Sequence, residues 1–71
     1  MSKQNDFIEC ELWLIHETAE AFLLSSDEDE DDKEWFPKTQ CQWDPEDLPA
    51  DGKGIFTLSI KERYLLKKGF L

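Results

Sequence analysis

Polar and apolar residues alternate through the first part of the chain, between Phe7 and Thr18. One parity of this segment is largely apolar and holds Ile8, Cys10, Leu12, Leu14 and His16; the other holds Phe7, Glu9, Glu11, Trp13, Ile15 and Glu17. Successive side chains of a strand point to opposite faces, so the pattern predicts a β-strand with one buried and one partly solvated face. A helix would mix glutamates and apolar residues around its circumference.

Shorter segments of the same kind follow. A turn at 18–20 leads into a second strand at Ala21–Leu24, so the first two strands cover residues 7–24. A third strand is expected over 34–43, with Pro37 at a sheet edge or bulge because proline has no backbone N–H. The Pro-, Gly- and Asp-rich stretch 44–53 predicts a loop, and residues 54–59 a fourth strand.

A helix is expected at the C-terminal end. Ser59 and Glu62 have capping-box spacing, which predicts a helix over 60–68, with Gly69 at the left-handed position after it. Tyr64, Leu65, Phe70 and Leu71 would close one end of the sheet. Since 71 residues with 39% apolar content supply one core, the sequence predicts a single α+β domain over 1–71, mainly β. It would be a small four-stranded antiparallel curled sheet or open barrel with a short C-terminal helix.

Charge changes this picture most. The chain has 17 acidic and 8 basic residues, for a formal net charge of −9. Sixteen of the acids lie in 1–52 beside three lysines, whereas 53–71 hold five basic residues and one acid. An acidic body repels nucleic acid and attracts basic protein surfaces. The partner expected is therefore a host protein with a basic surface, and direct nucleic-acid binding is disfavoured.

Six consecutive acids in the loop 25–33 cannot be buried, so this loop is exposed. Two interpretations stay open: a surface that replaces a row of phosphates for a basic protein, or a solvated tip that keeps a small apolar domain soluble. Acids on neighbouring strands extend the negative surface. The candidate partner-binding residues are Asp27, Glu28, Asp29, Glu30, Asp31, Asp32, Glu34, Glu9 and Glu11.

Other side chains give weaker indications of a site. Cys10 and Cys41 are expected to be reduced and buried, and with one histidine, His16, they fall short of a zinc ligand set. The acidic run has no central glycine for a calcium loop. We expect no metal, no cofactor and no enzymatic activity, because no nucleophile arrangement or phosphate-binding loop occurs. Trp13, Trp35 and Trp43 would supply core area on one sheet face, or one of them would anchor a partner inside an acidic rim.

The segment Trp35-Phe36-Pro37-Lys38-Thr39-Gln40 resembles a W-x-P-K-S-Q segment of short phage-encoded proteins. In those, a strand with an H-E-T-like string (here His16-Glu17-Thr18) precedes an acidic hairpin, the Trp-Pro-Lys strand, and a last strand followed by a helix. The resemblance covers about residues 7–71, with Thr39 in place of Ser and Phe36 in place of an aliphatic residue. It implies a phage or prophage origin and this order of elements, and it implies no activity.

The leading hypothesis is a phage-encoded acidic protein that binds and inhibits a nucleic-acid-binding host protein of defence or DNA processing, as a nucleic-acid mimic. One alternative is a small nucleic-acid-binding accessory protein that uses Lys53, Lys61, Arg63, Lys67, Lys68 and exposed aromatics. Another is a virion structural or assembly factor. No apolar run spans a membrane and Met1–Asp6 has no signal-peptide core, so the expected location is the host cytoplasm. Homodimerisation through an edge strand is possible.

Overall fold

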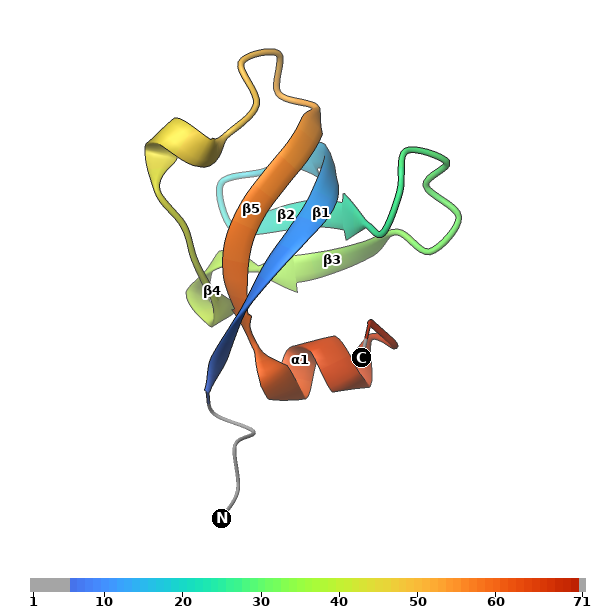
Figure 1. Ribbon diagram of the computed structural model, residues 1–71, viewed down its shortest axis with the longest axis vertical. Coiled ribbons are helices and arrows are strands. Elements are labelled where there is room, and N and C mark those ends of the chain that lie inside the picture. Colours follow the sequence, from blue (N-terminus) through green and yellow to red (C-terminus); the bar gives the residue numbers. More distant parts are fainter. Residues whose placement is uncertain (1–5, 71) are drawn as a thin grey trace.

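Five antiparallel strands form one sheet in the order β3-β2-β1-β5-β4. The computed structural model describes residues 6–70 (Figure 1). The strands are β1 (Phe7–Glu17), β2 (Ala21–Ser25), β3 (Glu34–Pro37), β4 (Cys41–Gln42) and β5 (Gly54–Lys61), followed by helix α1 (Glu62–Lys67). Short 3-10 turns occupy Lys38–Gln40 and Pro45–Asp47. The predicted mainly-β architecture with a short C-terminal helix is confirmed, but there are five strands rather than four.

The long central strand β1 serves two neighbours. Its first part pairs with β5, from Phe7 opposite Lys61 to Leu14 opposite Gly54, and its last part pairs with β2. The register shifts between Leu14 and His16, so one extra residue stands in β1 at that point. Such a bulge bends a strand and changes which face the following residues occupy. The expected placement of His16 on the same face as Leu12 and Leu14 is therefore wrong: His16 lies opposite Leu23 and is exposed.

The predicted third strand over 34–43 is two strands on opposite edges of the sheet. β3 pairs with β2 and ends at Pro37, the 3-10 turn Lys38–Gln40 follows, and β4 pairs with β5. Pro37 cannot donate a ladder hydrogen bond, which suits the end of an edge strand. The edge position expected for Pro37 is confirmed, while the continuation of the same strand through Cys41 and Trp43 is wrong.

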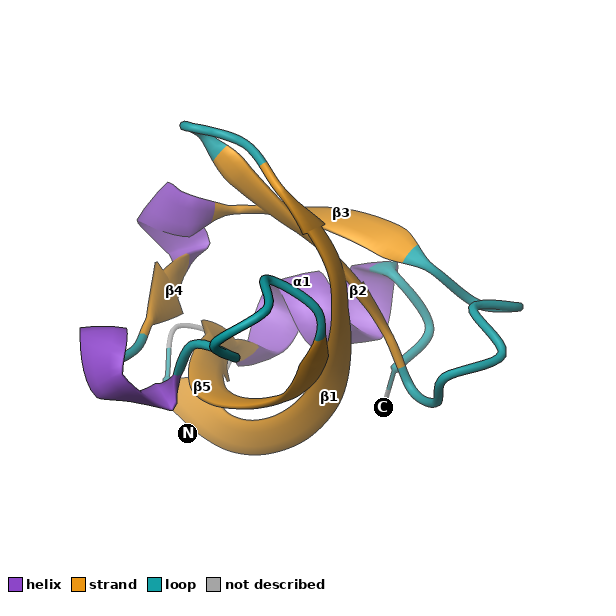
Figure 2. Ribbon diagram, turned by 90° about the horizontal axis from the view of Figure 1, so that it is seen from above, coloured by secondary structure: helices purple, strands orange, loops and turns teal. Residues whose placement is uncertain are grey.

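The sheet is strongly curled because its two edge strands are joined by only three residues. Figure 2 shows β1 and β5 bending around the interior, with β3 and β4 following each other on the other side. In residues 6–70, β3 and β4 do not pair with each other, so the sheet stays open along this seam and is not closed into a barrel. The open form of the predicted curled sheet is thus the one observed.

The C-terminal helix is shorter than predicted. β5 continues through Ser59 and Ile60 to Lys61, and α1 begins at Glu62 with no side-chain cap. The capping-box assignment of Ser59 is wrong because Ile60 is fully buried and pairs with both Ile8 and Cys41, which holds this segment in the sheet. Gly69 has a φ of 82°, so its predicted left-handed position after the helix is confirmed. The expected contribution of Leu71 lies outside the described residues.

The interior is filled by alternate residues of the sheet and by one helix residue. Side chains with at most 2% exposure include Leu14, Phe22, Leu24, Phe36, Phe56, Leu58, Ile60 and Leu65. Phe22 packs edge-on against Phe56 and Trp43, with ring centroids 5.0 and 4.8 Å apart. Trp43 therefore faces the core, so the expectation that all three tryptophans share one sheet face is wrong. Burial of these side chains is the main stabilising contribution in so small a domain.

Candidate partner-binding surface

The acidic loop between β2 and β3 folds on its own polar groups. The Asp29 N–H donates to Asp27 Oδ1 at 3.0 Å, and the Ser26 N–H donates to Asp32 Oδ1 at 2.9 Å. The Ser25 hydroxyl, which is fully buried, donates to the Asp27 carbonyl oxygen. Hydrogen bonds from the Ser26 hydroxyl and N–H lower the pKa of Asp32. Asp32 thus ties the two ends of the loop together, and Asp27 shapes the turn with which the loop begins.

The six loop acids consequently have different roles. Asp27 and Asp32 accept backbone hydrogen bonds, and Glu30 has a positive φ of 64° with its carboxylate 3.9 Å from Lys53 Nζ. Glu28, Asp29 and Asp31 are exposed, and within residues 6–70 their carboxylates form no ion pair. An ordered loop therefore presents three carboxylates to solvent without internal neutralisation.

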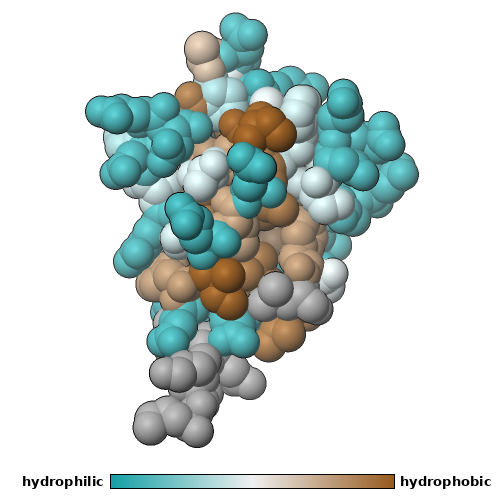
Figure 3. Space-filling view, viewed as in Figure 1, coloured by the Kyte–Doolittle hydropathy of each residue, from teal (hydrophilic) through white to brown (hydrophobic). Residues whose placement is uncertain are grey.

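The other predicted site residues do not join this group. Glu34 lies at the start of β3 with its carboxylate 3.6 Å from Lys68 Nζ. Glu9 and Glu11 are exposed on β1, opposite Ser59 and Thr57 of β5. Figure 3 shows hydrophilic lobes at the upper left and at the right, where Figure 1 places the Pro45–Asp47 turn and the β2–β3 loop, with more apolar surface between them. The acidic surface is therefore divided into separate areas.

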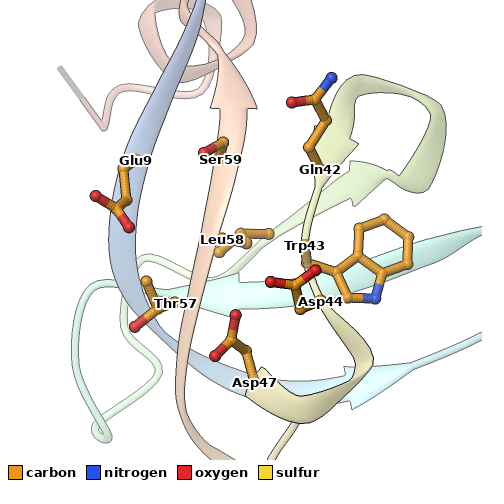
Figure 4. A pocket seen from close by; sticks show the side chains of 8 residues that line it. All are labelled: Glu9, Gln42, Trp43, Asp44, Asp47, Thr57, Leu58 and Ser59. Carbon is orange, nitrogen blue, oxygen red and sulfur yellow. The ribbon is translucent and has the colours of Figure 1, made fainter.

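A pocket of about 270 Å³ lies beside Glu9 on the surface of the sheet (Figure 4). It forms where β1, β5 and the segment after β4 meet, since Glu9 and Gln42 both pair with Ser59. Its lining is Glu9, Gln42, Trp43, Asp44, Asp47, Thr57, Leu58 and Ser59. Three of these residues are carboxylates. The sequence could not group Asp44 and Asp47 with Glu9, because their proximity depends on the pairing of β4 with β5.

The five basic residues proposed for nucleic-acid binding do not form one continuous surface, because two of them are ion-paired. Lys53 faces Glu30 and Lys68 faces Glu34. The remaining three lie against aromatic rings. Lys61, at the end of β5, lies 6.0 Å from the Phe7 centroid, and Arg63 and Lys67 of α1 lie 5.9 and 5.8 Å from that of Tyr64. The basic area is thus much smaller than the five residues suggested, and its shallow pocket is lined by Arg63, Tyr64 and Lys67.

Both cysteines are free thiols; Cys41 is buried as predicted, whereas Cys10 is only half-buried. Burial raises the pKa of Cys41 to about 12 and, together with the charge of Glu9, raises the pKa of Cys10. Thiols held in the neutral form are poor nucleophiles and poor metal ligands. In the described part of the chain, no group of three or more His, Cys, Asp or Glu side chains is placed to hold a metal ion.

Trp35 is the most exposed tryptophan. Trp35 is 43% exposed on β3, whereas Trp13 and Trp43 are less exposed and are half-buried. Its ring contacts His16 edge-to-face at a centroid distance of 6.1 Å, and its strand partner is Leu23. The sequence pointed to three candidate tryptophans without distinguishing them, because the break between β3 and β4, which carries Trp43 onto Phe22, is not visible in the local pattern.

Comparisons with protein-family models, with curated protein sequences and with solved structures gave no significant match. Among residues 6–70, no helix has the length and apolar character needed to cross a membrane.

Proposed function

We propose that this protein is a phage-encoded acidic interaction protein that binds a basic, nucleic-acid-binding host protein and inhibits it by occupying its nucleic-acid site. The observation that carries the proposal is the β2–β3 loop. It is held in a defined conformation by Asp27 and Asp32 while Glu28, Asp29 and Asp31 remain exposed and unpaired within residues 6–70. The phage origin rests on the resemblance of the segment 35–40.

The proposed mechanism is electrostatic occupancy. Carboxylates on an ordered loop act as phosphate surrogates for Lys and Arg side chains, and charge-assisted hydrogen bonds are stronger than neutral ones. Because the loop is already folded by its own hydrogen bonds, less conformational entropy is lost on binding than for a disordered acidic segment. The net charge of −9 also accelerates encounter with a basic partner.

The test is affinity capture from a bacterial lysate with the wild-type protein and a Glu28→Lys/Asp29→Lys/Asp31→Lys variant. This variant keeps Asp27, Asp32 and Glu30, so the hydrogen bonds and the Lys53 contact that shape the loop are retained. The matched control carries Glu20→Lys/Glu46→Lys/Asp51→Lys, an equal charge change at exposed positions elsewhere. Circular dichroism establishes that all three proteins are folded.

We expect the wild type and the control variant to retain one stoichiometric DNA- or RNA-binding protein that duplex DNA elutes competitively. The loop variant should lose at least about tenfold in affinity for it, because each lost charge-assisted hydrogen bond is worth about 1.5–3 kcal/mol. Equal binding by the folded loop variant contradicts the proposal. Direct, salt-sensitive DNA binding by the wild type, lost on Arg63→Glu and Lys67→Glu, would instead support the nucleic-acid-binding alternative.

A further inference from the structure

We infer that Trp35 forms, together with the adjacent acidic loop, a site for an arginine side chain of the basic partner. The inference rests on the proposed function and makes it more specific, since it names the partner group that is recognised. Trp35 lies one residue beyond Glu34, where β3 leaves the acidic loop, and its strand partner Leu23 lies just before the loop on β2. The indole and the exposed carboxylates therefore belong to the same hairpin.

The distribution of cations over the other aromatic rings supports this assignment. Phe7, Phe22, Trp43 and Tyr64 each have a lysine or arginine of this chain within 6.0 Å of the ring centroid. Within residues 6–70, Trp35 has no such cation, although it is 43% exposed. Its one aromatic contact is the edge-to-face pair with His16. Trp13 and Phe70 also have no such cation among the described residues, but both are half-buried. Trp35 is therefore the most exposed of the rings that have capacity for an external cation.

Charge complementarity decides the kind of occupant. A cation over an indole face is attracted by the negative face of the ring, and more strongly when the pair is desolvated. Arginine fits better than lysine because its planar guanidinium stacks on the ring and can also donate a forked hydrogen bond to a carboxylate. A second copy of this chain is a poor occupant, because it would bring another acidic loop toward the first, each chain having a net charge of −9.

The experiment uses two synthetic peptides of equal charge, one alternating arginine with glycine and the other lysine with glycine. Binding is followed at low salt by the indole N–H resonances of the three tryptophans in two-dimensional NMR spectra. The variants are Trp35→Ala, Trp35→Phe, the loop variant with lysine at 28, 29 and 31, and Ile55→Ala as a matched control. Ile55 is 54% exposed on β5, which is separated from β3 by β2 and β1 in the sheet.

We expect the wild type to bind the arginine peptide about fivefold more tightly than the lysine peptide, with the Trp35 resonance shifting most. Trp35→Ala should remove this preference, Trp35→Phe should retain part of it, and Ile55→Ala should leave it unchanged. Thermal unfolding of each variant establishes that the fold is retained.

The two levels of the proposal fail differently. If the loop variant loses both peptides but Trp35→Ala keeps the arginine preference, the Trp35 site is wrong and the acidic surface stands. If the loop variant binds both peptides as tightly as the wild type, the proposed function fails as well. A single-stranded oligonucleotide that shifts the Trp35 resonance when neither peptide does would overturn the assignment and indicate base stacking.

Discussion

Lys38 lies between the edge strands β3 and β4, where the sheet is open, and contacts aromatic residues of the core. It begins the 3-10 turn between β3 and β4, and its Nζ forms an ion pair with Glu17 at the end of β1. The same atom lies 5.0 Å from the Phe22 centroid and 5.9 Å from that of Trp43. Its side chain is only 20% exposed. One lysine therefore covers an aromatic pair that would otherwise border the seam.

Replacing Lys38→Met should lower the free energy of unfolding by about 1 kcal/mol. The methionine keeps an apolar stem over Phe22 but removes the charge from both rings and from Glu17. Glu17→Gln, which removes only a partly exposed ion pair, should cost less than about 0.5 kcal/mol. Urea unfolding followed by tryptophan fluorescence measures both. If the two variants lose equal free energy of unfolding, the contact of Lys38 with the two rings does not stabilise the fold.

At the same scale, the sequence identified the acids of the site but not their roles. Asp27, Asp31 and Asp32 are equivalent in the sequence and all are exposed, yet only Asp27 and Asp32 accept backbone hydrogen bonds from described residues that shape the loop. Those roles depend on how the loop turns back on itself. The pocket beside Glu9 could not be predicted either, because Asp44 and Asp47 approach it only through the pairing of β4 with β5.

Local sequence patterns predicted a strand or helix correctly where tertiary packing favoured the same structure. Alternation of side chains identified β1 and most of β5, and a short apolar run identified β2. The patterns failed where tertiary packing overrode a local preference. The capping-box spacing of Ser59 and Glu62 favoured an earlier helix start, but burial of Ile60 between Ile8 and Cys41 keeps that segment in β5. Propensity is weak compared with burial of a large apolar side chain.

The end of α1 is where sequence and structure agree best. The Gly69 N–H donates to the Leu66 carbonyl at 3.2 Å and the Phe70 N–H donates to that of Leu65 at 2.8 Å, the hydrogen-bond pattern of a Schellman motif. This turn carries Phe70 onto Phe36, with ring centroids 5.3 Å apart. The motif therefore joins the helix end to the core beneath β3.

Gly69→Ala should lower the free energy of unfolding by about 1 kcal/mol, because alanine is strained at a φ of 82°. A Cβ at this position would meet no atom within 4 Å, so the cost is conformational rather than steric. Gly69→Asn should cost less, since asparagine tolerates the left-handed region better. Thermal melts of the two variants provide the comparison. A loss that is larger for Asn than for Ala would contradict the conformational explanation.

Across the whole molecule, charge is segregated along the fold. The acidic β2–β3 loop and the acidic turn Pro45–Asp47 occupy opposite sides of the sheet in Figure 1. Arg63 and Lys67 lie together beside Tyr64 on α1, and Lys61 lies just before this helix. Three ion pairs join described residues of opposite charge, which leaves most of the acids without a nearby cation. Such an arrangement favours encounter with a basic surface but opposes the compact state through self-repulsion.

Salt should therefore act on stability and on binding in opposite directions. Between about 10 mM and 1 M salt the screening length falls from about 30 Å to about 3 Å, so repulsion among the acids weakens and the Tm of the free protein should rise. Affinity for a basic partner or the arginine peptide should fall over the same range, because the attraction is screened as well. The Glu28→Lys/Asp29→Lys/Asp31→Lys variant, six charge units less negative than −9, should show a smaller salt effect on both quantities.

Calorimetry at a series of salt concentrations measures the Tm, and titration of the peptide measures the affinity. A Tm that falls with salt in the wild type would show that cations within the fold already neutralise the acids. The excess negative charge would then not drive binding.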